Sequence, residues 1–184
     1  METLIRSLAW IVGAGLALTL GALPAGAAPA LSENQLKAVF LFQFSQFVDW
    51  PARAFAQPGD PFVIGLLGGD PFGAILDDLV RSETATGRAI VVRRLGAPAE
   101  ARSCQIVFVA TGAEKALAEA ALGKQPVLTV GESPEFDREG GMILFVRERS
   151  RVRLRINLGP ALQAGLTISS KLLRVADQVE GLPP

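Results

Sequence analysis

Hydrophobic side chains recur every three or four positions over residues 36–51, the longest amphipathic pattern in the chain. This spacing predicts a helix with a broad buried face, and its stripe contains Leu36, Val39, Phe40, Phe44, Phe47 and Val48. Ser32 and Gln35 have the spacing of a capping box, which predicts the start of the helix. Pro51 disfavours helical geometry at Trp50, so the helix is predicted to end there. Trp50 then either belongs to the core or faces a groove or a partner.

Short, largely apolar runs bounded by Gly or Pro follow this helix and predict strands. They are residues 62–67, 88–95, 104–110 and 127–130. Asp70 and Pro71 predict the start of a helix that reaches Val80, and its predicted inner face contains Ile75, Leu76 and Leu79. Residues 113–122 predict an alanine-rich helix. The alternation of strands with helices indicates a mainly parallel sheet covered on both faces.

The pattern changes to strict alternation at residues 142–147 and 151–157, which are separated by a three-residue loop and predict a hairpin. Helical patterns return from Pro160, and Ser169 or Ser170 is expected to cap a last helix whose face contains Leu172, Leu173, Val175, Ala176 and Val179. The predicted fold is therefore α/β. It is a single three-layer domain, with a mixed, mainly parallel sheet, helices on both faces and an antiparallel hairpin at one edge.

The first 27 residues have the pattern of a cleavable signal peptide. Arg6 precedes an uncharged apolar run, and the sequence A-G-A at 25–27 matches a cleavage site. The apolar run is shorter than the roughly 20 residues that a bilayer core requires. We therefore expect export, and a single domain over residues 28–184 without a membrane span after cleavage.

Charge and composition exclude several functional classes. The formal net charge is zero, which gives no argument for nucleic acid or an anionic membrane as a partner. The chain has no histidine, which excludes Ser-His-Asp catalysis and His-based zinc sites. Its single cysteine, Cys104, precludes an internal disulfide; it is expected to be a small buried hydrophobe, with an intermolecular disulfide as the alternative.

The acidic residues form no predicted site. Asp77 and Asp78 are the nearest pair, but adjacent helical positions point about 100° apart and make a poor shared set of ligands. We therefore expect no catalytic residues, no cofactor and no metal, and a protein that is not an enzyme.

Two polar features are candidates for binding. The turn at residues 68–73 follows a strand and opens a helix, but it lacks the spacing of a dinucleotide or P-loop motif, so a capped turn is the simpler interpretation. A row of arginines occupies Arg147, Arg149, Arg151, Arg153 and Arg155. The row is either a solvated face of the sheet or an edge that meets an acidic partner or an anionic ligand.

The order of motifs along the chain resembles the YfiR family, also called the DUF4154 domain, over about residues 36–179. The motifs are F-V-D-W-P (47–51), D-P-F-G (70–73), G-R-x-I-x-V-R-R-L (87–95), C-Q-I-V-F (104–108), V-L-T-V-G-E (127–132), F-D-R-E-G-G-M-I (136–143), R-V-R-L-R-I-N (151–157) and I-S-S-K-L-L (168–173). Each motif is weak alone, and their order behind a signal peptide is specific.

The resemblance implies a periplasmic protein that forms dimers and binds the periplasmic sensor domain of an inner-membrane diguanylate cyclase. Binding represses the cyclase, and cyclic di-GMP signalling and biofilm formation then fall. The alternative hypothesis is a periplasmic small-ligand-binding or uptake accessory protein. The lone Cys104 departs from the characterised family pattern and precludes an intramolecular redox switch.

The expected contact surface is a groove between the aromatic helix and the hairpin. Its candidate partner or ligand contacts are Trp50, Phe47, Arg151, Arg153, Arg155 and Asn157.

Overall fold

A computed structural model of the 184-residue chain describes residues 31–149 and 151–181. The expected signal peptide at residues 1–27 lies outside the described residues. The elements, in chain order, are α1 (Glu33–Phe47), β1 (Val48–Asp49), η1 (Ala52–Ala54), β2 (Phe62–Leu67), α2 (Ala74–Val80), β3 (Thr84–Ala85), β4 (Arg88–Leu95), η2 (Pro98–Ser103), β5 (Ile106–Val109), α3 (Glu114–Ala120), β6 (Leu128–Gly131), α4 (Pro134–Arg138), β7 (Ile143–Glu148), β8 (Arg151–Asn157), α5 (Leu158–Gln163), β9 (Thr167–Ile168), α6 (Ser170–Val175) and β10 (Gln178–Glu180). Within this part of the chain, no helix has the length and apolar character needed to cross a membrane.

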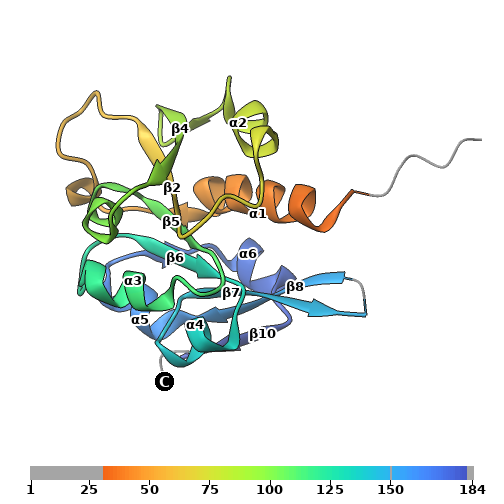
Figure 1. The fold of residues 1–184 in the computed structure, drawn as a ribbon. Coiled ribbons are helices and arrows are strands. Elements are labelled where there is room, and N and C mark those ends of the chain that lie inside the picture. Colours follow the sequence, from red (N-terminus) through yellow and green to blue (C-terminus); the bar gives the residue numbers. More distant parts are fainter. Residues whose placement is uncertain (1–30, 150, 182–184) are drawn as a thin grey trace, which may run out of the picture. The chain divides into compact units, whose positions relative to one another are not determined.

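The main sheet is mixed and mostly parallel, as the sequence predicted (Figure 1). Its strand order is β10-β8-β7-β6-β5-β2-β4-β3. The neighbours from β7 to β4 are parallel, and β8 returns antiparallel to β7 as the expected hairpin. The short strand β10 pairs parallel to β8 outside the hairpin. A separate two-stranded sheet, β1 with β9, lies at the end of α1.

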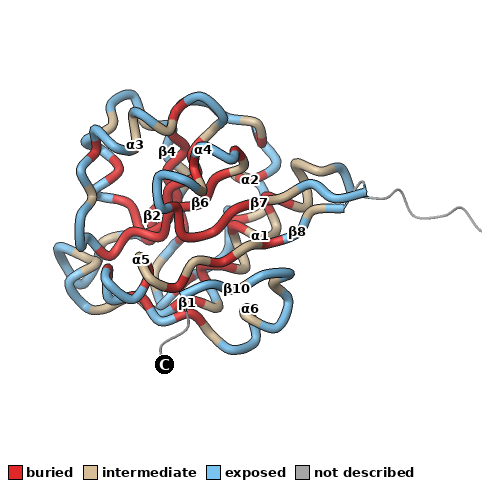
Figure 2. The backbone as a smooth tube through the Cα atoms, turned by 90° about the horizontal axis from the view of Figure 1, so that it is seen from below, coloured by how far each residue is buried: buried red, intermediate tan, exposed pale blue. Residues whose placement is uncertain are grey.

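Apolar side chains bury both faces of the sheet. Alternate residues of β2 enter opposite clusters: Phe62 and Ile64 join the cluster under α1, α2, α5 and α6, whereas Val63 and Leu67 join the cluster under η2, α3 and α4. Figure 2 shows the central strands β2 and β6 buried throughout and β7 buried over its first half. The uninterrupted apolar runs in the sequence follow from this two-sided burial.

Helix α1 begins as predicted and ends earlier. The Ser32 hydroxyl accepts a hydrogen bond from the Gln35 N–H, and the Gln35 side chain accepts one from the Ser32 N–H. The helix stops at Phe47 because the next two residues form β1, in which Val48 pairs with Ile168. A long-range strand pairing, rather than Pro51, therefore sets the end of α1.

The buried face of α1 is rotated from the predicted stripe. Its buried residues are Lys37, Ala38, Leu41, Phe44 and Ser45, while Leu36, Val39, Phe40 and Phe47 are only half-buried. The helix carries apolar residues on several sides and packs against α2 and α6 as well as the sheet. Its neighbours therefore decide which side is fully covered.

The helix after β2 begins later than the sequence predicted. Asp70 does not cap it; its carboxylate accepts hydrogen bonds from the N–H groups of Phe72 and Gly73 in a local turn. Gly73, with a φ of 55°, directly precedes α2. Of its predicted inner face, Ile75 is 39% exposed and Leu76 is buried.

The C-terminal segments differ from prediction at two places. Glu148 pairs with Arg151, so the hairpin connection has two residues instead of three. Ser169 caps α6 as expected, but the helix ends at Val175, and Val179 belongs to β10 instead of the helical face. Backbone pairing with β8, which begins where the Asp177 N–H donates to the Leu154 carbonyl at 2.8 Å, outweighs the helical spacing of the apolar residues.

Two further predicted elements are shorter in the structure. The strand predicted from residue 104 begins at Ile106, and the helix predicted at residues 113–122 covers Glu114–Ala120. Cys104 lies just before β5 and is buried, as expected.

Candidate functional site

The sheet reverses its direction of growth between β2 and β5. The chain leaves β2 for β4 on one side and then crosses back to β5 on the other. The carboxyl ends of strands at such a point are the usual place for a binding crevice in α/β folds. Here the two loops are in contact, because a Cβ added to Gly68 would lie 2.2 Å from the Ala113 Cβ. The open space therefore lies beside the crossing point, under the first turns of α1.

A hollow of about 360 Å³ occupies this place. Its walls come from α1, from the loops that follow β2, β5 and β6, and from β7. The lining residues are Glu33, Asn34, Lys37, Pro71, Thr111, Glu132, Phe145 and Arg147. Asn34 donates to the Pro71 carbonyl at 2.7 Å and ties α1 to the loop after β2.

Lys37 is the central charge of the hollow and is only 7% exposed. Its Nζ lies 2.6 Å from Glu33 Oε1 and 2.7 Å from Glu132 Oε2. Burial by itself would lower the pKa of Lys37, but the hydrogen bonds and charges of Glu132 and Glu33 outweigh it and raise that pKa. The same hydrogen bond from Lys37 lowers the pKa of Glu33. The site is thus polar and carries both signs of charge, and two ion pairs hold the Lys37 ammonium group.

The arginine row continues from this hollow along the hairpin. Arg147 Nη1 lies 3.5 Å from Glu33 Oε2, and Arg155 pairs with Asp137 at 3.2 Å and with Glu180 at 3.8 Å. Among the described residues, Arg153 pairs with one carboxylate, that of Asp177, at 3.8 Å. Ion pairing thus differs along the row, being closest at Arg155 and weaker towards the turn.

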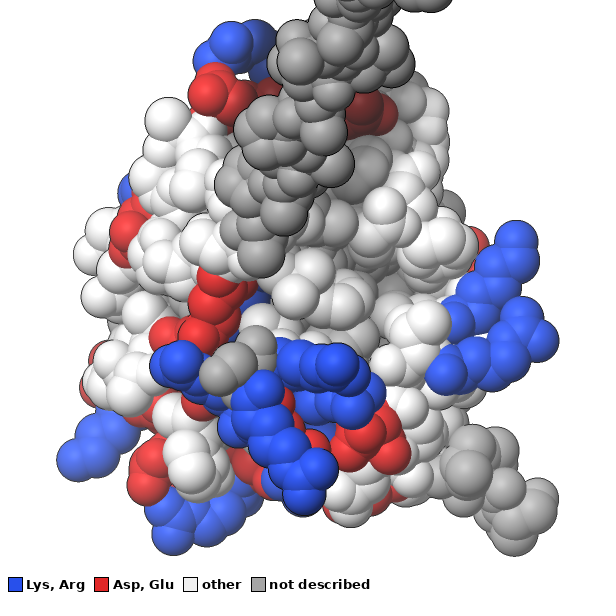
Figure 3. Space-filling model, turned by 90° about the vertical axis from the view of Figure 1, so that its right-hand side faces the viewer, with Lys and Arg blue, Asp and Glu red and all other residues white. Residues whose placement is uncertain are grey.

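Arg149 and Arg151 lie at the turn of the hairpin. Both are exposed, and neither forms an ion pair with any described carboxylate. Figure 3 views the side to which the hairpin extends and shows Lys and Arg side chains gathered there, with Asp and Glu beside them. The end of the hairpin therefore presents two arginines against one carboxylate, Glu148, which lies opposite Arg151, and its charge is positive.

The other expected contact residues lie elsewhere and make internal contacts. Trp50 packs against Phe62, the first residue of β2, with ring centroids 4.9 Å apart and ring planes at 89°. The backbone carbonyl of Phe47 accepts from the Ser169 N–H, and the Asn157 side chain caps α5. Arg153 pairs with Val146 towards the opposite end of the sheet. The structure does not bring Trp50 and Arg153 into one groove.

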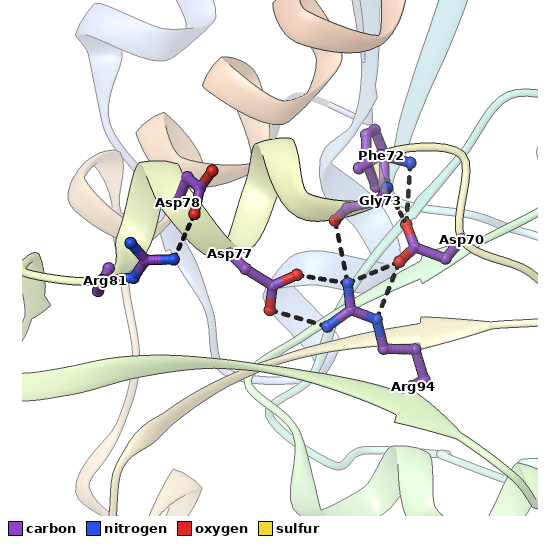
Figure 4. Close-up of polar contacts among 7 residues, drawn as sticks. All are labelled: Asp70, Phe72, Gly73, Asp77, Asp78, Arg81 and Arg94. Carbon is purple, nitrogen blue, oxygen red and sulfur yellow. Dashed lines mark hydrogen bonds and ion pairs between the residues drawn. The ribbon is translucent and has the colours of Figure 1, made fainter.

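The turn at residues 68–73 is held by an arginine that the sequence analysis did not single out. Figure 4 shows Arg94 of β4 between Asp70 and Asp77, with Nε 2.9 Å from Asp70 Oδ2 and Nη1 2.8 Å from Asp77 Oδ1. The hydrogen bond from Arg94 lowers the pKa of Asp77. Two carboxylates at the start of α2 would repel a phosphate, so the structure favours a local turn closed by Asp70 over a phosphate site.

Asp77 and Asp78 also point to different partners. Asp78 pairs with Arg81, while Asp77 pairs with Arg94. Across residues 31–149 and 151–181, no three His, Cys, Asp or Glu side chains are grouped so that they could hold a metal ion.

Lys37 and Glu132 were missed for a physical reason. A lysine within an aromatic helix signals a buried charge, but its second partner lies 95 residues away, and local spacing does not show such a pair.

A family model and solved structures match this chain. A family model described as DUF4154, YfiR/HmsC-like, matches residues 34–177. No curated protein matches this chain. A conserved domain protein from Vibrio cholerae aligns with 13% identity and a TM-score of 0.45 over 82% of this chain and 61% of its own. The ABC domain from Streptococcus pneumoniae, solved in complex with L-Trp, aligns with 14% identity and a TM-score of 0.44 over 64% of this chain and 55% of its own.

Proposed function

Because the chain belongs to the YfiR/HmsC-like family, we propose that it is a periplasmic regulatory protein, formed by residues 28–184 after removal of a signal peptide. It binds the periplasmic sensor domain of an inner-membrane diguanylate cyclase and lowers cyclic di-GMP output. Binding, and not catalysis, is its role. Homodimer formation, which the family resemblance implies, belongs to the same proposal and is measurable by light scattering.

The positive end of the hairpin is the observation that supports a protein partner. Arg149 and Arg151 are exposed without a described carboxylate partner, and the one ion pair that Arg153 makes with the described residues is long, at 3.8 Å. Charged groups at an interface steer association and select partners of opposite charge. An acidic patch on the sensor domain would therefore meet this surface. Trp50 and Phe47 lie away from this surface, and Trp50 borders a separate hollow with Phe55 and Arg88.

Charge reversal on the hairpin tests this proposal. The purified chain is titrated with the purified sensor domain, and R151E/R153E is expected to bind at least tenfold more weakly while unfolding at the wild-type denaturant concentration. R93E is the matched control, because Arg93 is an exposed arginine on β4, away from the hairpin. In cells, the double variant should raise cyclic di-GMP as deletion does. An unchanged affinity in R151E/R153E, or a deletion without effect on cyclic di-GMP, would contradict the proposal.

A periplasmic small-ligand-binding or uptake accessory protein is the second candidate. The hollow around Lys37, with charges of both signs, favours it. A thermal-shift screen with nucleotides, amino acids and siderophore-like anions would show stabilisation by one of these classes. No shift with any of them would count against this candidate.

A further inference from the structure

A second hollow lies at the opposite end of the parallel strands. It has a volume of about 400 Å³ and borders the start of β2 and the residues that precede β5. Its charged lining residues are Arg53, Arg93, Arg102 and Asp60. Three cations and one carboxylate give this small space a local net charge of +2.

The three guanidinium groups are positioned by neutral oxygens. None of them forms an ion pair with a carboxylate of residues 31–149 or 151–181. Their anchoring bonds run from Arg53 Nη2 to the Ala164 carbonyl at 2.7 Å, from Arg93 Nη1 to Ser103 Oγ at 3.0 Å, and from Arg102 Nε to the Ala120 carbonyl at 2.8 Å. Arg53 and Arg102 each make a second, longer bond of 3.5 Å, to the Lys124 and Ala121 carbonyls, and the Arg53 guanidinium packs on Gly165. A guanidinium carries five N–H donors, so Arg93 keeps four of them for another acceptor, and Arg53 and Arg102 keep three each.

Asp60 leaves this positive charge largely uncompensated. Its carboxylate accepts from the Gln57 N–H at 2.8 Å in a local turn and makes no ion pair with the described arginines. Asp60 therefore lines the hollow without forming an ion pair that would neutralise one of its arginines.

A buried amide fixes the wall that carries Arg53. Gln105 is 4% exposed; its Oε1 accepts from the Val63 N–H at 2.8 Å, and its Nε2 donates to the Ala54 carbonyl at 2.6 Å. These bonds hold the segment after Trp50 against the amino ends of the central strands β2 and β5. Walls that are already in place lower the ordering cost of binding a ligand.

We propose that this hollow binds a small phosphate monoester. A phosphate monoester carries a charge of about −1.5 to −2 and three acceptor oxygens, which match the net charge of the site and the N–H donors that its arginines retain. The half-buried ring of Phe55 and the side chain of Val63 supply apolar surface for the organic part of the ligand. The volume lies within the range of about 300–1,000 Å³ that is usual for small-molecule sites.

This site is independent of the proposed regulatory contact. Its arginines come from η1, β4 and η2, whereas that contact uses the β7–β8 hairpin. Failure of either proposal therefore leaves the other standing.

Titration calorimetry of the full chain tests the site, with phenyl phosphate as the probe and inorganic phosphate and phenol as its two halves. We expect saturable binding of phenyl phosphate at one site, weaker binding of inorganic phosphate and none of phenol. R93Q and R102Q should each lower the affinity about tenfold, as expected for the loss of a hydrogen bond to a charged group. R151Q, on the hairpin, should leave it unchanged.

Higher ionic strength should also weaken binding, because the attraction is between charges. Thermal unfolding of each variant establishes that it is folded, and two separate arginine variants keep the test valid if one of them is not. The proposal is overturned if phenyl phosphate does not saturate, if phenol binds as well as phenyl phosphate, or if folded R93Q and R102Q bind like the wild type.

Discussion

At the scale of single residues, Trp50 shows how a side chain at the end of a helix can be fixed by distant contacts. Its ring packs edge-on against Phe62, and its indole N–H donates to the Gln105 carbonyl at 3.1 Å. The same Gln105 side chain holds the wall of the arginine-lined hollow. Trp50 therefore supports both the core and this wall.

Replacement of Trp50 by alanine should lower the free energy of unfolding by about 3 kcal/mol, because the apolar contact with Phe62 is lost and a space remains. Trp50→Phe keeps a ring but loses the N–H donor, and should cost about 1 kcal/mol. Urea unfolding of both variants is the measurement. If Trp50→Ala unfolds like the wild type and fails only in partner binding, the structural role assigned to the indole is wrong.

The single thiol, Cys104, is 2% exposed, and burial raises its pKa to about 11. We expect no reaction of the native protein with a thiol reagent at mildly alkaline pH, because the reactive thiolate is both scarce and covered. In guanidinium chloride the same thiol should react completely. Fast stoichiometric labelling of the native chain would contradict this, and would revive the intermolecular disulfide as an alternative.

At the scale of elements, α4 illustrates how a very short helix is held by tertiary packing. Five residues are too few to form a stable helix alone. Ser133 caps it by accepting from the Phe136 N–H at 3.1 Å, and Phe136 itself is 1% exposed. The ring of Phe136 lies against Gly131 and Gly141, where an added Cβ would come within 2.3 Å and 2.0 Å of ring atoms. The two glycines create the space that anchors the helix.

Gly141→Ala should therefore destabilise the protein by about 2–3 kcal/mol, since the new methyl group forces the Phe136 ring out of its position. Gly59→Ala is the matched control: no atom lies within 4 Å of its added Cβ, and a change below about 0.5 kcal/mol is expected. Chemical denaturation measures both. Equal stability of the two variants would show that Phe136 has room to move and does not anchor α4.

At the scale of the whole molecule, ion pairs and hydrogen bonds link elements that the backbone leaves separate. Lys37 connects α1 to the residue that follows β6, and Arg94 connects β4 to α2 and to the turn before it. Both contacts lower the pKa of a carboxyl group, that of Glu33 through Lys37 and that of Asp77 through Arg94. A hydrogen bond from Ser133 lowers the pKa of Glu114 in the same way.

These lowered pKa values predict a loss of stability in acid. A carboxyl group with a lower pKa in the folded state stabilises the fold above its unfolded pKa, about 3.9–4.3, and this contribution disappears as pH falls through the folded pKa. The urea midpoint should thus decrease as pH drops below about 4. Glu33→Gln should show a lower midpoint at neutral pH and a smaller decrease in acid. A midpoint that is the same at neutral and acidic pH would refute this linkage.

The sequence predicted several elements to the residue because their signals are local. The strands β2, β4 and β8 have the bounds expected from their apolar or alternating runs. The capping box at Ser32 and Gln35 was also predicted correctly, because its signal is local. The alternation in β8 also predicted which side of the strand carries the arginines, and Arg151 and Arg153 are exposed as that pattern requires.

The candidate site was harder to predict, because it depends on which residues the fold brings together. Arg155 looks like its neighbours in the row, yet only the fold places Asp137 and Glu180 beside it. Trp50 and Arg153 were expected to share a groove, but strand order separates them. Arg53, Arg93 and Arg102 come together only because the amino ends of β2 and β5 meet.

The sequence by itself thus determined the α/β class, the family resemblance, most strands and the caps, since periodicity and capping act over a few residues. Tertiary structure alone decided which side of α1 is buried, that Val179 pairs in β10, and that Lys37 lies between Glu33 and Glu132. The physical reason is range. A hydrogen bond or ion pair between residues far apart in the chain can override a local conformational preference. Local spacing in the sequence does not show which distant residue will form it.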